Sequence, residues 1–151
     1  MSFDKIKIIS TRLKYGVSPP SPADEVEQHV TIWSNGEVKI SRYVFGDIRS
    51  GYVKAWSDTF YITKPDVENI FEHISMYFAE NYEKKKKKDN PGCWEMTVTM
   101  EDGMRKKIRG HLCHDEYEAG DIELSRLIRE TLARPYPLWL FNGRLEEGRG
   151  R

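Results

Sequence analysis

The alternation of apolar residues from Val26 to Val44 constrains the fold of this chain more than any other feature. Every aliphatic side chain in this stretch has an even number, and Ser34-Asn35-Gly36 interrupts the pattern. A period of two is typical of a strand with one buried face. A three-residue loop with Gly36 in the left-handed conformation would pair Ile32 with Val38 and keep the aliphatic side chains on one face. A two-residue loop would pair even with odd positions, so the stretch predicts a hairpin with the longer loop.

A second hairpin is predicted between Trp94 and Leu112. Its first half alternates apolar and polar residues, and Glu101-Asp102-Gly103 supplies a loop of the same length that also ends in glycine. The expected cross-strand neighbours are Met96 with Ile108, Met100 with Met104, Cys93 with His111, and Glu95 with Arg109. Because the last pair has opposite charges, it should stabilise this register by a few tenths of a kcal/mol.

The other stretches predict three strands and two helices. Lys5–Tyr15 is rich in isoleucine, but its apolar phase changes at Ile9, which indicates a bulge or a strand covered on both faces. Thr63 can cap a helix whose apolar residues recur at intervals of three and four. A second helix is expected from Asp121 to Ala133. The two further strands are expected at Tyr52–Ile62 and, as a short buried strand, at Leu138–Phe141.

Together these elements predict the α+β class. We expect an antiparallel sheet of five to six strands built on two hairpins, with two helices packed on one face. A single domain is expected over residues 1–143, followed by a flexible C-terminal tail at 144–151. The 12% of aromatic residues compensates for an apolar fraction of 38%, because each aromatic side chain buries a large area.

The overall charge is balanced, with 24 basic and 24 acidic residues. No segment has the strong basic excess that drives binding to a phosphate backbone, and the lysines at 84–88 fit a solvated helix end. No apolar run is long enough to span a bilayer, and the N-terminal residues lack a signal-peptide pattern. We therefore expect a cytoplasmic protein without a membrane partner, with both cysteines reduced.

The best candidate for a metal site combines Cys93, His111, Cys113 and His114. Cysteine and histidine are the usual zinc ligands, and the second hairpin would place Cys93 opposite His111. The spacing matches none of the usual zinc motifs, and ordinary side chains at a strand end explain it better. The acidic stretch at 115–123 does not match a calcium-binding loop. No motif of nucleophilic, metal or nucleotide-dependent catalysis is found, so we expect no cofactor and assign no catalytic residue.

The odd-numbered face of the two hairpins is the most interesting surface. The candidate binding residues there are Trp33, Lys39, Tyr43, Arg105, Lys107 and Arg109. Aromatic side chains stack on bases and cations bind phosphates, so such a face could hold single-stranded nucleic acid. The neutral total charge favours a different interpretation, in which the N-terminal strand or a partner subunit covers the aromatic residues.

The last third of the chain resembles other proteins in a series of short motifs. Its elements are Trp94-x-Met96-x-Val98, Asp102-Gly103, Ile108-x-Gly110, Leu124-Ser125-x-Leu127-Ile128-Arg129 and Leu138-Trp139-Leu140-Phe141-Asn142-Gly143. This pattern is similar to one in small uncharacterised bacterial proteins of unknown function. The resemblance covers residues 94–143 and implies no activity, cofactor or site residue.

The leading hypothesis is a small non-enzymatic bacterial protein that acts by macromolecular interaction. Its partner would be an unknown protein or a second copy of the chain. Trp33, Tyr136 and Trp139 motivate this hypothesis, because we expect them to remain partly exposed near hairpin and chain ends. The alternatives are a sheet that binds single-stranded nucleic acid and a metal-dependent enzyme.

Overall fold

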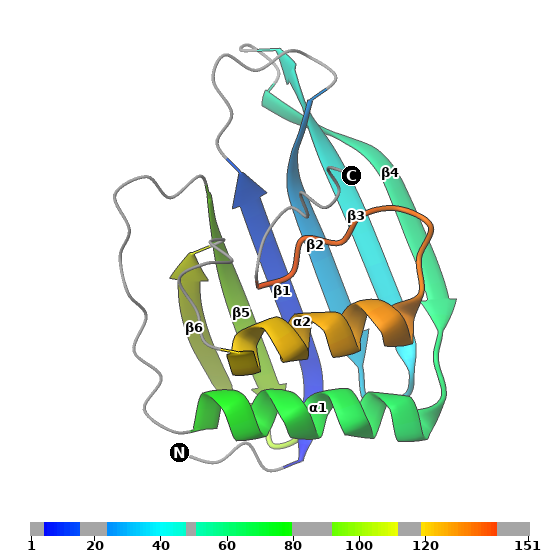
Figure 1. Ribbon diagram of the computed structural model, residues 1–151, viewed down its shortest axis with the longest axis vertical. Helices are drawn as coiled ribbons and strands as arrows, with labels where there is room; N and C mark the ends of the chain where they lie inside the picture. Colours follow the sequence, from blue (N-terminus) through cyan, green and yellow to red (C-terminus); the bar gives the residue numbers. More distant parts are fainter. Residues whose placement is uncertain (1–4, 16–23, 48–50, 80–91, 112–118, 142–151) are drawn as a thin grey trace.

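The computed structural model describes residues 5–15, 24–47, 51–79, 92–111 and 119–141. It has the predicted α+β class, with a six-stranded antiparallel sheet and two helices (Figure 1). The strands are β1 (Ile6–Tyr15), β2 (Glu25–Trp33), β3 (Glu37–Asp47), β4 (Gly51–Tyr61), β5 (Gly92–Met100) and β6 (Arg105–His111). The helices are α1 (Lys64–Ala79) and α2 (Ala119–Leu132).

The first strand of the chain lies in the middle of the sheet, whose order is β4-β3-β2-β1-β5-β6. Strands β1 to β4 form a meander in which each strand pairs with its neighbour in the chain. The β5–β6 pair then adds to the other side of β1 through β5. The sheet is therefore a four-stranded meander extended by the β5–β6 pair.

The hydrophobic core lies between the sheet and the helices, which are on the same side of the sheet in Figure 1. Even-numbered side chains of β2, β3 and β5 point into it, and Ile40 and Met96 are fully buried. They share the core with Ile70 of α1 and Ile128 of α2. In the described part of the chain, both helices lie on the side of the sheet that carries the core, and neither lies on its other side (Figure 1).

The β2–β3 hairpin has the predicted register, with Ile32 opposite Val38. Gly36 has a φ of 101°, the left-handed conformation that the three-residue loop requires. Its carbonyl oxygen accepts the N–H of Ile62 at 2.9 Å, and a Cβ at Gly36 would lie 2.6 Å from the Ile62 carbonyl oxygen. Glycine is therefore needed here both for the backbone conformation and for a close backbone approach.

The β5–β6 hairpin also has the predicted register, with Met96 opposite Ile108. Gly103 has a φ of 94°, and the N–H of Met100 donates to the carbonyl oxygen of Met104 at 2.8 Å. The side chain of Met104 does not join the core, because it is 67% exposed at the loop. The predicted pairing of the two methionines is thus found in the backbone, without a buried contact.

Two local features of β1 and α1 follow the sequence. The register of β1 against β5 shifts between Ile6 and Ile8, so a bulge explains the change of apolar phase. The Thr63 hydroxyl oxygen accepts the N–H of Asp66 at 3.2 Å and caps α1 as predicted.

Residues 138–141 are buried but do not form the predicted strand. Side chains satisfy the backbone groups of this segment in place of a neighbouring strand. The fully buried Gln28 of β2 donates to the carbonyl oxygen of Pro137 at 3.0 Å and accepts the N–H of Trp139 at 3.1 Å. Arg129 of α2 donates to two carbonyl oxygens of the segment at 2.7 and 2.8 Å. These contacts leave Trp139 2% exposed, which corrects the expectation that it stays partly exposed.

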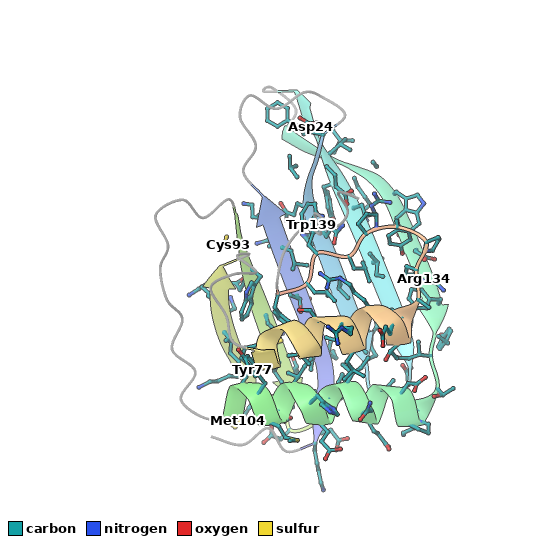
Figure 2. All side chains as sticks on the ribbon, in the orientation of Figure 1. Asp24, Tyr77, Cys93, Met104, Arg134 and Trp139 are labelled. Carbon is teal, nitrogen blue, oxygen red and sulfur yellow. The ribbon has the colours of Figure 1, made fainter. Side chains whose placement is uncertain are left out.

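A cluster of three aromatic rings anchors the end of this segment. Phe141 contacts Trp94 and Phe78 edge-on, with ring centroids 4.8 and 5.4 Å apart. The N–H of Phe141 also donates to the hydroxyl oxygen of Ser125 at 3.3 Å. Figure 2 shows Trp139 on the helical side of the sheet, where the segment after α2 crosses the strands. The chain after α2 therefore completes the core.

Candidate functional site

The sheet face without a helix carries all six predicted binding residues. We call it the open face, and one cross-strand row defines it: Ser41, His29, Arg12, Glu95 and Arg109. Side chains alternate along a strand, so the other odd-numbered residues of β5 and β6, of β2 from Glu27 onward and of β3 up to Tyr43 point the same way. In the described part of the chain, neither helix lies over this face (Figure 1).

Charge is unevenly distributed over the two sides of the sheet. Among the described residues, the open face has seven basic side chains, namely Arg12, Lys14, Lys39, Lys54, Arg105, Lys107 and Arg109. It has three acidic ones, Glu27, Glu37 and Glu95. All seven basic residues are exposed, whereas the three glutamates are buried or half-buried. A chain with no net charge thus presents a basic surface on one side.

The predicted binding residues form two groups on this face. Trp33, Lys39 and Tyr43 lie on β2 and β3, and the three cations lie on β6. Because β1 and β5 separate β2 from β6, the two groups are about 14 Å apart at a strand spacing of about 4.8 Å. They share one face but do not form one compact site.

A buried carboxylate organises the middle of the open face. Glu27 is 6% exposed, and its carboxylate contacts His29 Nε2 at 2.5 Å and Arg12 Nε at 3.2 Å. The ring of Tyr43 packs on His29, with the centroids 4.6 Å apart. Burial raises the pKa of Glu27, but the hydrogen bond from His29 and the charges of His29, Lys14 and Arg12 outweigh it and hold that pKa below 4.5. Glu27 is therefore a carboxylate at neutral pH that fixes its basic neighbours.

Hydroxyl groups line the centre of the open face beside this cluster. Thr31, Ser10 and Thr97 lie in one row between Lys39 and Lys107. The hydroxyl oxygens of Ser10 and Thr31 are 3.3 Å apart, within hydrogen-bonding distance. This row between the two predicted groups is thus polar and uncharged, and it can donate and accept hydrogen bonds.

The metal candidates are not brought together within the described residues. Cys93 lies opposite His111 as predicted, but Cys113 and His114 fall outside the described ranges, as does most of the acidic stretch. Among the described residues, no group of three or more His, Cys, Asp or Glu side chains could hold a metal ion.

A polar cluster on the helical side has a structural role. Asp58 of β4 accepts hydrogen bonds from Arg134 Nη1 and from the Tyr136 hydroxyl, both at 2.9 Å. The bond from Arg134 lowers the pKa of Asp58, while burial and the bond to Asp58 raise the pKa of Tyr136. Tyr136 therefore stays protonated and donates. This cluster fastens the chain after α2 to the edge strand, and Figure 2 shows Arg134 beside β4.

Sequence reasoning missed the residues that connect the two groups. Arg12 and Lys14 belong to β1, which lies between β2 and β5, and Glu27 lies beside them. The register of the first hairpin already predicts that Glu27 lies opposite Tyr43 on the odd-numbered face. The position of β1 in the sheet could not be predicted, because strand order depends on contacts between distant parts of the chain.

Comparisons with known proteins add no assignment. The chain matches no protein-family model, no curated protein and no solved structure. Neither helix, within the described residues, is long and apolar enough to cross a membrane.

Proposed function

We propose that this protein is a non-enzymatic binding protein whose open face holds single-stranded nucleic acid. The separation of charge carries the proposal, because seven exposed cations share the open face with three glutamates of lower exposure. Phosphates are bound largely by such sequence-independent attraction. The balanced charge of the whole chain argued against nucleic acid, but charge acts through the surface that a ligand meets.

The aromatic residues add a reason to favour a single strand over a duplex. Trp33 and Tyr43 are half-buried on the open face, beside the exposed Lys39. Unpaired bases can stack on such rings, and stacking contributes about 1–3 kcal/mol per base. The bases of a duplex are already stacked on each other and cannot reach a flat sheet. An extended strand lying across the sheet would meet the aromatic group first and the β6 cations second.

Fluorescence anisotropy with a short labelled oligonucleotide tests the proposal. We expect single-stranded DNA or RNA to bind at low salt, and a matched duplex to bind more weakly. The logarithm of the binding constant should fall with the logarithm of the salt concentration, with a slope of about 0.7 for each phosphate contacted. Trp33→Ala combined with Arg105→Ala should abolish binding because it removes stacking and a phosphate contact together.

A matched control is Arg126→Gln, which removes an exposed arginine from α2 on the helical side. This variant should bind like the wild type. Absence of oligonucleotide binding at low salt would exclude the proposed function. Equal losses in Arg126→Gln and Lys107→Gln would show that total charge, and not the open face, determines binding.

A second candidate function is self-association through the edge of β4. Among the residues that the structure describes, three of the five exposed large hydrophobic residues lie on this edge strand, namely Val53, Trp56 and Tyr61. An exposed edge offers unpaired backbone groups to another strand. Sedimentation equilibrium would show a dimer, and Val53→Lys should shift it to a monomer. A monomer at all concentrations of the wild type would exclude this candidate.

A further inference from the structure

A pocket of about 280 Å³ lies on the open face across β1, β5 and β6. Its lining residues are Arg12, Lys14, Cys93, Trp94, Glu95, Arg109 and Gly110. Gly110 contributes no side chain to the pocket, and the Trp94 indole lies on the other side of the sheet, in the core. The charged part of the lining consists of three cations and one carboxylate, so the pocket favours an anion.

Carboxylates hold both arginines of this pocket in place. Arg109 Nε contacts Glu95 at 2.8 Å, and Arg12 Nε contacts the buried Glu27 at 3.2 Å. A guanidinium has five N–H donors, so contacts through Nε leave Nη donors for another acceptor. Arginine also suits phosphate because its planar donors match two oxygens at once. The glutamates therefore act as positioning residues for two arginines on β1 and β6, the strands on either side of β5.

The geometry points to this pocket as a site for one phosphate group, bound by Arg12, Arg109 and Lys14. The inference deepens the proposed function, because a phosphate of the bound strand would occupy the pocket. The same chemistry would accept the phosphate of a free nucleotide or inorganic phosphate. A comparison of inorganic phosphate with the oligonucleotide distinguishes these sources of the phosphate group.

Cys93 supplies a reporter, because its exposed thiol lies in the pocket lining. Cys113 is the other cysteine of the chain, so Cys113→Ser leaves Cys93 as the single thiol. The rate of its reaction with iodoacetamide, a neutral reagent, is measured in inorganic phosphate, in chloride at the same ionic strength, and with the oligonucleotide. Phosphate and the oligonucleotide should slow the reaction in a saturable manner, at least several-fold, and chloride should not.

Arg12→Gln and Arg109→Gln, each in the Cys113→Ser background, should lose most of the protection. Arg126→Gln, the matched change on the helical side, should keep it. Circular dichroism checks that each variant is folded. If Arg12→Gln does not fold, Arg109→Gln decides the question, since Arg109 is the more exposed of the two, at 60% against 56% of its side chain.

The outcomes separate this inference from the proposed function. If the oligonucleotide binds but neither it nor phosphate protects Cys93, the pocket assignment is wrong and the open face still binds the strand. If phosphate protects Cys93 but the oligonucleotide does not bind, the pocket is a phosphate site and the proposed function fails. Protection by chloride equal to that by phosphate would overturn the inference, because it would show general screening.

Discussion

The β2–β3 and β5–β6 hairpins turn with the same local chemistry but lie in different surroundings. Gly36 and Gly103 have similar φ values of 101° and 94°. A Cβ at Gly36 would collide with the backbone of Ile62, whereas a Cβ at Gly103 would have no described heavy atom within 4 Å. The difference shows that local sequence determines the shape of a turn, while its neighbours determine how much the turn contributes to stability.

The ion pairs of the two hairpins show the same contrast. Arg42 binds Glu25 through two hydrogen bonds of 2.8 and 2.7 Å, and its guanidinium also lies over the ring of Tyr136 at 4.8 Å. Arg109 binds Glu95 at 2.8 Å with 60% of its side chain exposed, against 26% for Arg42. The first pair belongs to a packed network that includes the chain after α2, and the second belongs to the surface.

The sharpest test of this comparison is glycine replacement in the two loops. Gly36→Ala should cost about 3 kcal/mol or more of unfolding free energy, since it combines backbone strain with overlap against a carbonyl group. Gly103→Ala should cost about 1–2 kcal/mol, because it has the strain without the overlap. Urea unfolding of both variants measures the difference. Equal losses would show that the contact of Gly36 with Ile62 is unimportant.

Replacing Gln28 tests whether β2 holds the chain after α2. Gln28→Ala removes three hydrogen bonds, one of them to Glu25, and leaves buried backbone groups of the 137–139 segment unsatisfied, so we expect a loss of about 2–3 kcal/mol. Trp139 fluorescence should shift toward that of an exposed indole in native conditions. Thr97→Ala, on the open face of β5, is the control and should change stability by less than about 0.5 kcal/mol. A Gln28 variant as stable as that control would refute the role of this amide.

Double-mutant cycles compare the two ion pairs directly. The coupling energy of Arg42 with Glu25 should be about 1–2 kcal/mol, because the pair is bidentate and half-buried. The coupling of Arg109 with Glu95 should be about 0.2–0.5 kcal/mol, as for other exposed pairs. Thermal unfolding of the single and double alanine variants yields both values. A larger coupling in the second pair would reverse the comparison.

The smallest expected effect concerns the pH dependence of stability. Since the folded pKa of Glu27 lies below its ordinary value of 4.5, its carboxylate stabilises the fold above that value. This stabilisation is lost as the pH falls through the lowered, folded-state pKa. Glu27→Gln should therefore destabilise the protein at pH 7 and flatten the acid limb of its stability profile. Thr31→Ala, an uncharged change on the same strand, should leave the shape of the profile unaltered.

Alternation and turn chemistry were enough to predict much of the fold. The register of both hairpins, the capping of α1 by Thr63 and the bulge in β1 all depend on residues close together in the chain. The segment at 138–141 was predicted as a strand because it is apolar and short. Its backbone is instead satisfied by Gln28 and Arg129, and no local pattern reveals such distant partners.

Local alternation also predicted part of the candidate site, namely which residues share one face of the sheet. Odd-numbered positions identified Trp33, Tyr43 and the β6 cations as members of one face. The distance between the two groups, and the arginine and lysine of β1 between them, depend on strand order. The overall charge balance did not predict the basic open face, because a sum over the chain does not record on which side of the sheet each charge lies.

The burial of Trp139 and Phe141 has a consequence for how the protein is made. A nascent chain that has already emerged through β6 and α2 would still lack two of its buried aromatic side chains. Its helices and sheet would expose apolar surface to chaperones and to other nascent chains until these late residues leave the ribosome. Stable folding is therefore expected only after residue 141 has left the ribosome, and translation products truncated before this residue should be targets for proteolysis.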